Sequence, residues 1–388
     1  MNGKRNIGKR LVRNRGAFFG LIVISASVII AIVAYLIAPD PSPDANRIIV
    51  EIGGRTPGFR QLFLLVRKQE QPPSVSFFHR LLYGREDAYD YLPINNYAVK
   101  GDSIIAEKFV DQGVSERLSW PLTQLTAPPE PASGLVSPPG ATPSAGTVPS
   151  SGAPIPIAGA VPTKTLTFWL GTDKYGRDIL SRLLVGVRVS LAVGMVTVLL
   201  SLSVGVLLGA LAGYFRGRVD EIILWLVNVI WSIPTLLLVF AIMLVLGKGF
   251  WQVFVAIGLT LWVNVARIVR GQVLVVRERE YVEAARALGY SHSRILFRHI
   301  LPNVMGPVWV VAASNFASAI VIEAGLSFLG VGVQPPQPSW GLMIKENYNF
   351  IITHNPVLAL APGVAIMLLV LAFNLLGNGL RDALDVRV

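Results

Sequence analysis

The chain has 388 residues, of which 53% are hydrophobic and 15% are charged, and its mean hydropathy is +0.57. This composition is too apolar for a soluble globular protein, so it predicts a chain that crosses a membrane several times. The formal net charge of +11 comes with no nucleic-acid-binding motif, and a basic excess in a membrane protein more often reflects topology than nucleic-acid binding.

The sequence carries no pattern for a metal or nucleotide site. It has no cysteine, and its four histidines include no pair at metal-ligand spacing. It also lacks a Gly-x-x-x-x-Gly-Lys-Ser/Thr phosphate-binding loop, so we do not expect it to bind or hydrolyse ATP. We therefore expect no catalytic residue, metal or cofactor, no enzyme activity and no nucleic-acid partner.

Six apolar runs predict an all-α fold with six transmembrane helices, because each run is about as long as a bilayer-crossing helix. The first, at 18–38, follows a basic tail at 1–17, and no convincing cleavage site of a signal peptide comes after it. The later runs lie near 191–214, 222–246, 250–269, 304–329 and 357–376. Arginines and lysines gather in the tail and in alternate loops, which places both termini in the cytoplasm.

Residues 39–168 are expected to form a large extracytoplasmic insert between the first two helices, followed by a membrane core at 169–388. Within the insert, 46–125 mixes apolar clusters with charged, aromatic and turn residues, which predicts a small folded unit that is either α/β or mainly irregular. The stretch 127–162 is rich in Pro, Ala, Ser and Gly and nearly uncharged, so it is predicted to be an extended linker.

The most informative motif lies in the loop at 272–303, between the fourth and fifth apolar runs. Its small residues let another helix approach closely, its acidic residue offers a polar contact, and its glycine permits a turn between two short helices. The motif residues are Glu283, Ala284, Ala285, Gly289, Leu301 and Pro302.

Further motifs lie at 170–182, 213–217, 232–234, 322–336 and 374–385. In this order, and with the 272–303 motif, they resemble the permease subunits of bacterial dipeptide, oligopeptide and nickel ABC importers, which are binding-protein-dependent transport systems of the inner membrane. The resemblance covers Leu170 to the C-terminus, and the first span and its basic tail also fit. One position departs from the family pattern, because His299 stands where the pattern has isoleucine and Ile300 follows it.

The resemblance implies a multi-pass permease of the bacterial inner membrane that forms half of a translocation path through the lipid bilayer. It implies four partners, namely a second homologous permease, two ATP-binding subunits and an extracytoplasmic solute-binding protein. The helix around Glu283 would rest in a cleft of one ATP-binding subunit, which makes 272–303 a cytoplasmic coupling loop. Peptides are the leading solute class, followed by nickel, opine-like compounds, glutathione and peptide antibiotics.

Three features inside the membrane core also suggest roles. Gly205, Gly209 and Gly213 recur every four residues and predict close helix packing, either within the chain or against the partner permease. Pro234 is expected to kink or unwind the third helix, as a flexing point for gating or for packing alone. Glu323 is an acid in an apolar span, so it is either a gate or pathway group or an interfacial residue bonded to a neighbouring loop.

Two other classes of protein compete with this interpretation. An ion-coupled secondary transporter would place ionisable residues near the membrane midplane and show internal repeats, and the sequence shows few such acids and no repeat. A membrane anchor for an extracytoplasmic binding or assembly domain would make the insert the functional part. Deletion of about 46–162 distinguishes the two interpretations. Retained transport makes the insert an accessory of a permease, whereas lost binding with an intact pore favours the anchor.

Overall fold

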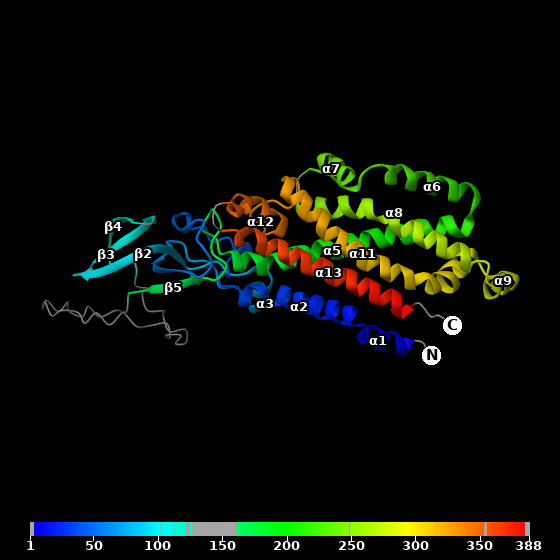
Figure 1. The fold of residues 1–388 in the computed structure, drawn as a ribbon, viewed down its shortest axis with the longest axis horizontal. Helices are drawn as coiled ribbons and strands as arrows, with labels where there is room; N and C mark the ends of the chain where they lie inside the picture. The colour runs from blue at the N-terminus through cyan, green and yellow to red at the C-terminus, as the bar shows by residue number, and fades with distance from the viewer. Residues whose placement is uncertain are drawn as a thin grey trace, which may run out of the picture.

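The fold is a long helical bundle with a β-sheet beyond one end (Figure 1). The structure is a computed structural model, and it describes residues 4–101, 103–111, 113–121, 125, 161–247, 249–352 and 355–384. Nearly all of the predicted linker at 127–162 lies outside these residues. We call the two ends of the bundle the sheet end and the α9 end, after the short helix α9 (Glu280–Ala287) that lies farthest from the sheet.

Five described helices are long and apolar enough to cross a membrane, and a bent pair raises the number to six if it counts as one span. The prediction of a helical membrane fold is therefore confirmed. Besides α9, the described helices, with the candidate spans included, are α1 (Lys4–Arg13), α2 (Arg15–Ile37), α3 (Phe77–Tyr83), α5 (Ile179–Phe215), α6 (Gly217–Ser232), α7 (Thr235–Leu246), α8 (Phe250–Val276), α10 (His292–Arg294), the π-helix η3 (Ile295–Ile300), α11 (Leu301–Leu329), α12 (Trp340–Asn347) and α13 (Val357–Leu384). The 3-10 turns are η1 (Pro43–Ala45), η2 (Val50–Ile52) and η4 (Tyr348–Ile351).

The third predicted span is broken rather than continuous. Helices α6 and α7 together cover that run, but they meet at an angle of 96°. The break falls at Ile233 and Pro234, where Ile233 adopts an extended conformation and Pro234 precedes α7. Proline lacks a backbone N–H and disfavours a helical conformation in the residue before it, so helix α6 ends at this position.

The longest helix, α5, packs against α8 through a face of glycines. A Cβ atom at Gly209 would lie 2.4 Å from the carbonyl oxygen of Ala266, and one at Gly213 would lie 2.8 Å from Cβ of Val273. Gly205 is equally close to α8. Because the missing side chains let the two backbones approach, these glycines pack within the chain and not at its outer surface.

The insert contains a five-stranded antiparallel sheet in the order β4-β3-β2-β1-β5. Its consecutive residues Phe63 and Leu64 are both fully buried, in separate hydrophobic clusters, as expected when strand side chains alternate between faces. The strands are β1 (Phe59–Arg67), β2 (Tyr89–Lys100), β3 (Ser103–Asp111), β4 (Val114–Pro121) and β5 (Thr163–Phe168). Strand β5 follows the predicted linker and returns to pair with β1, which the sequence did not indicate.

Candidate functional site

The loop between α8 and α11 folds around the short helix α9. On one side of α9, Val282 and Ala285 are buried in a hydrophobic cluster with residues of η3 and α11. On the other side, Glu283 and Ala284 are exposed, and Leu288 just beyond the helix is 71% exposed. Helix α9 is therefore held to the bundle by one face and presents a second face of small, apolar and acidic side chains.

Gly289 ends α9 in a left-handed conformation, with φ of +77°. Its N–H donates to the carbonyl of Arg286 at 2.9 Å, and the N–H of Tyr290 donates to the carbonyl of Ala285 at 3.2 Å. These two bonds make a Schellman motif, in which glycine is favoured because a side chain is strained at positive φ. The glycine of the sequence motif therefore sets the direction in which the chain leaves α9.

Polar contacts tie this loop to neighbouring helices. The hydroxyl of Tyr214, at the end of α5, lies 2.8 Å from Nδ1 of His292 in α10. The guanidinium of Arg277 donates to the carbonyl of Tyr214, and the amide of Asn303 donates to the hydroxyl of Tyr281 at 3.2 Å. The position of α9 is therefore linked to α5, α8 and α11.

The region around α9 is strongly cationic. Burial, together with the neighbouring charges of Arg216 and Arg286, lowers the pKa of Arg277. Glu278 pairs with Arg216 at 2.8 Å, and both side chains are about half exposed. The local excess of arginine gives this end of the molecule a positive potential that suits an acidic partner surface.

The remaining motif residues lie where the loop joins α11. Pro302 is exposed in the first turn of α11, where its missing N–H breaks no helical hydrogen bond, and Leu301 is half-buried. Ile300 is fully buried, whereas His299 stacks on Tyr290 with a ring distance of 5.8 Å. The residue that packs into the core is thus Ile300, one position after the expected isoleucine.

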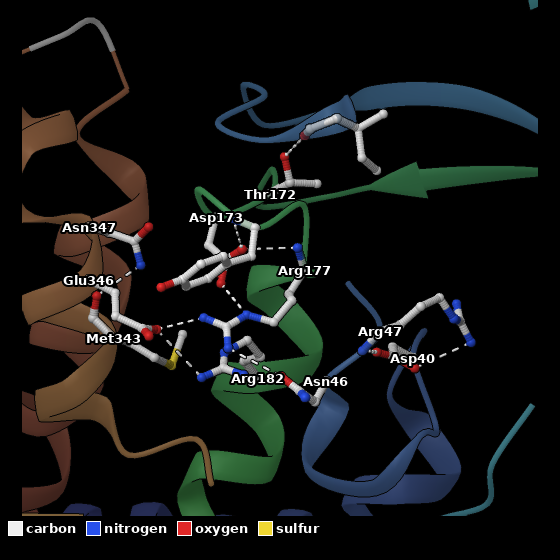
Figure 2. Close-up of polar contacts among 12 residues, drawn as sticks. Asp40, Asn46, Arg47, Thr172, Asp173, Arg177, Arg182, Met343, Glu346 and Asn347 are labelled. Atoms are coloured by element: carbon white, nitrogen blue, oxygen red, sulfur yellow. Dashed lines mark hydrogen bonds and ion pairs between the residues drawn. The ribbon is translucent and has the colours of Figure 1, made fainter. Parts of the chain in front are cut away.

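At the sheet end, the 170–182 segment forms a second polar centre (Figure 2). Nε of Arg177 donates to Asp173 at 2.6 Å, and Nη2 of Arg177 donates to Glu346 of α12, also at 2.6 Å. Arg182 lies 3.7 Å from the same Glu346 oxygen. We call Asp173, Arg177, Arg182 and Glu346 the junction cluster, because it joins the segment before α5 to α12.

The junction cluster is buried, so it forms no solute-contacting surface in this conformation. Asp173, Arg177 and Arg182 are each 3% exposed or less. Two acids and two bases balance in charge, which is how buried ionic groups are tolerated. Nearby, Asp178 caps α5 by accepting a hydrogen bond from the N–H of Ser181 at 2.8 Å, and burial raises its pKa.

Comparison with known proteins identifies the family. Residues 205–388 match the family described as binding-protein-dependent transport system inner membrane component, and residues 5–49 match the N-terminal transmembrane domain of oligopeptide transport permease C. The chain is 44% identical over 220 residues to the glutathione transport system permease protein GsiD of Pectobacterium atrosepticum. These 220 residues cover 57% of this chain and 73% of that relative. The chain belongs to this family of transport permeases.

Other similar proteins carry related names. The oligopeptide transport system permease protein OppC of Bacillus subtilis is 43% identical over 220 residues, which is 57% of this chain and 72% of OppC. Among solved structures, the MetNI methionine ABC transporter in an inward-facing conformation aligns with a TM-score of 0.45 and 20% identity, over 53% of this chain and 97% of the MetNI chain.

The protein is thus a permease subunit of an ABC importer in the inner membrane, and not an enzyme. An importer of this family operates with an ATPase and a substrate-binding protein. Family membership decides against both alternatives from the sequence, the ion-coupled secondary transporter and the membrane anchor for an outer domain.

In this permease, Glu323 binds a neighbouring loop. Its Oε1 accepts hydrogen bonds from Ser327 at 2.6 Å and from Ser339 at 2.7 Å, and its side chain is buried. Ser339 caps α12, and the hydroxyl of Ser327 accepts from the N–H of Val333. Glu323 therefore joins α11 to the segment that leads into α12, whereas Pro234 lies exposed at the break between α6 and α7.

Sequence reasoning missed the link between Tyr214 and His292 and the contribution of Glu346. Glu346 carried a weak signal, because it is an acid in a short, mainly apolar segment. Its two arginine partners are 164 or more positions away in the chain, so only the fold brings the three together.

Proposed function

We propose that this permease imports peptides or peptide-like solutes and is driven through helix α9. The observation that carries the proposal is that α9 is buried on one side only, with Val282 and Ala285 packed on the bundle while Glu283, Ala284 and Leu288 remain exposed. An exposed face on a helix that is firmly held at its back suits transmission of force from a partner, because movement of the partner then moves the bundle.

In this proposal, the exposed face of α9 docks in an ATPase cleft, and the cationic surroundings favour an acidic rim there. Closure of the ATPase pair would push α9, and the contacts of Tyr214 and Asn303 would pass the displacement to α5 and α11. A second permease would supply the other half of the path, and two ATP-binding subunits would serve the pair. Glu283, Ala284, Ala285, Gly289, Leu301 and Pro302 are the proposed coupling residues.

The solute class rests on the similar proteins. Their names specify glutathione, oligopeptides and dipeptides, which are all peptides or peptide-like. We assign the same chemical class to this permease, delivered by a substrate-binding protein on the insert side.

The proposed orientation places both chain ends, the α9 loop and the basic tail in the cytoplasm. Figure 1 shows α1 and the end of α13 at the α9 end of the bundle, so these basic segments share one side. The insert at 39–168, whose described part contains the five-stranded sheet, then lies outside the cytoplasm. This arrangement follows the tendency of lysine and arginine to remain inside.

Within the membrane, we propose that the break at Pro234 permits α6 and α7 to change their relative angle during gating. We assign Glu323 a supporting role, because its contacts to Ser327 and Ser339 hold the segment between α11 and α12. Gly205, Gly209 and Gly213 provide the rigid α5–α8 pair against which the broken span would move.

The proposal is tested by placing a bulky charge on the exposed face of α9. Ala284→Arg is expected to abolish uptake of a radiolabelled peptide and to release the ATPase from the purified complex, while the permease still inserts in the membrane. The matched control is Gly8→Arg, at an exposed α1 position where an added Cβ would meet no atom within 4 Å. Normal uptake by Ala284→Arg would contradict the coupling assignment.

A further inference from the structure

Helix α3 exposes an unusual number of large apolar side chains for a helix outside the membrane spans. Phe77, Phe78, Leu82 and Tyr83 are 60%, 71%, 49% and 62% exposed. These residues occupy a seven-residue helix between β1 and β2. An exposed aromatic cluster of this density indicates a surface that is covered in the working protein.

Four of the apolar side chains of α3 share one side of the helix. At 100° per residue, Phe77, Phe78, Leu81 and Leu82 fall within an arc of about 140°. The other side carries Arg80, together with Tyr83, whose ring lies 5.2 Å from that of His79. A short helix with aromatic and leucine side chains on one face and a basic residue on the other is the pattern of a helix that lies in a membrane interface.

The position of α3 along the bundle agrees with that pattern. Gly84, which ends α3, approaches the ring of Tyr35, and the carbonyl of Leu81 accepts a hydrogen bond from Arg188 of α5 at 3.3 Å. Tyr35 lies in the last turn of α2, a helix of 23 residues or about 34 Å. Because a hydrocarbon core is about 30 Å thick, the last turn of α2 reaches the boundary between lipid and water.

The exposed side of α3 also continues an exposed apolar surface of α2. Ile32, Leu36 and Ile37 of α2 are each at least 40% exposed on a helix that crosses the membrane. Figure 1 shows α3 beside the sheet-side end of α2. Lipid that covers this end of α2 would therefore meet the aromatic residues of α3, with Arg80 and Arg85 available to phospholipid phosphates.

We propose that α3 lies in the lipid interface on the insert side of the membrane, with Phe77, Phe78 and Leu82 among the acyl chains. The occupant of this surface is membrane phospholipid and not a protein. Helix α3 thereby fixes the height of the β-sheet above the membrane, because it is connected directly to β1 and β2. This inference is independent of the coupling role of α9.

The absence of cysteine from the chain makes the proposal directly testable. Phe78→Cys and Leu82→Cys are each labelled with a nitroxide in the assembled importer, reconstituted in nanodiscs of phosphatidylethanolamine and phosphatidylglycerol. Collision of the label with molecular oxygen reports lipid, and collision with a water-soluble nickel chelate reports water. Ile29→Cys, exposed in the middle of α2, and Val114→Cys, exposed at the start of β4, are the lipid and water references.

Labels at positions 78 and 82 are expected to lie between the two references, with more oxygen collision and less nickel collision than the Val114 label. A label at Arg80→Cys should collide more with the nickel chelate than either of them. The proposal is overturned if the labels at 78 and 82 match the Val114 label, which places α3 in water. It is also overturned if both reagents are excluded from them, which places a protein surface over α3.

Discussion

The hydroxyl of Tyr214 lies 2.8 Å from Nδ1 of His292, and this contact joins the end of α5 to the loop that carries α9. The two residues are 78 positions apart in the chain. The ring of Tyr214 also belongs to the hydrophobic cluster that buries Val282 and Ala285. One side chain thus contributes both packing and a hydrogen bond to the position of α9.

Tyr214→Phe keeps the packing and removes the hydrogen bond. We expect a loss of about 1 kcal/mol in the attachment of the loop, with the complex still assembled and peptide uptake reduced several-fold. Uptake per assembled complex, compared between wild type and variant, measures this effect. Equal uptake would mean that the hydrogen bond has no part in transmission from α9 to α5.

The cost of each substitution at Gly289 should depend on how well the new residue tolerates the left-handed backbone conformation, and not on its side-chain volume. A Cβ atom there would contact nothing within 4 Å, so the cost arises from φ of +77° alone. Gly289→Ala is expected to cost about 1 kcal/mol, and Gly289→Asn less, since asparagine tolerates this conformation better. Gly289→Pro should abolish uptake, because proline is fixed near φ of −65° and lacks the N–H donated to Arg286. Uptake in the order Gly, Asn, Ala, Pro checks the account, and a different order contradicts it.

Two glycine-to-alanine substitutions test the α5–α8 contact, because they should change the thermal midpoint in opposite directions. Gly209→Ala introduces a Cβ atom 2.4 Å from the Ala266 carbonyl oxygen, so it should lower the thermal midpoint of the purified permease. Gly271→Ala, in α8, meets no atom within 4 Å and should raise the midpoint slightly, since alanine favours a helix over glycine by about 1 kcal/mol. Equal midpoints for the two variants would contradict close packing at Gly209.

The junction cluster should be far more sensitive to charge removal than an exposed ion pair. Glu346→Gln leaves Arg177 and Arg182 buried without their shared acid, and the loss of one partner from a buried pair costs about 3–5 kcal/mol. The control is Glu278→Gln, which breaks a half-exposed pair with Arg216 and should cost at most about 1 kcal/mol. Thermal unfolding of both variants gives the comparison, and similar losses would contradict the importance of burial.

The stability of the insert should depend on Glu51, which lies 2.8 Å from Lys108 of β3. Burial raises the pKa of Glu51, but the hydrogen bond from Lys108, a backbone hydrogen bond and the charge of Lys108 together outweigh it and lower the pKa below 4.5. A lowered pKa means that the stabilisation is present above pH 4.5 and is lost as the pH falls through the folded-state pKa. The difference in stability between wild type and Glu51→Gln is therefore expected to be largest near neutral pH and to shrink in acid. A difference that grows in acid would refute this assignment.

The sequence predicted the membrane helices well, because a membrane-length apolar run is a strong local signal. Helices α2, α8 and α13 overlap predicted apolar runs, although α8 and α13 extend beyond them, and α5 begins at Ile179 rather than near residue 191. The helical turns before residue 191 contain Arg182 and Arg188, and these charges lower the local hydropathy. Asp178 caps the helix upstream of both arginines. The sequence indicates a helix after Asp178, but hydropathy alone does not show that this helix is continuous with the membrane span.

The α9 motif was also visible in the sequence, because its glycine permits a turn and its alanines permit close approach of another helix, and both are local properties. The side of α9 that is buried could not be predicted, because it depends on η3 and on Tyr214 from a distant part of the chain. The sheet was harder still. Strand β5 has six residues and its partner β1 lies across the predicted linker, so its pairing is set by tertiary contacts.

Crosslinking from the exposed face of α9 tests the central claim most directly. Since this chain has no cysteine, Leu288→Cys provides a single attachment point on it for a short thiol-specific photocrosslinker, which is attached to the purified permease before the importer is assembled. We predict a crosslink to the ATP-binding subunit from position 288 and none from Val114→Cys on the sheet. A transport-active complex in which position 288 forms no crosslink to the ATP-binding subunit would contradict the proposal that α9 couples ATP hydrolysis to import.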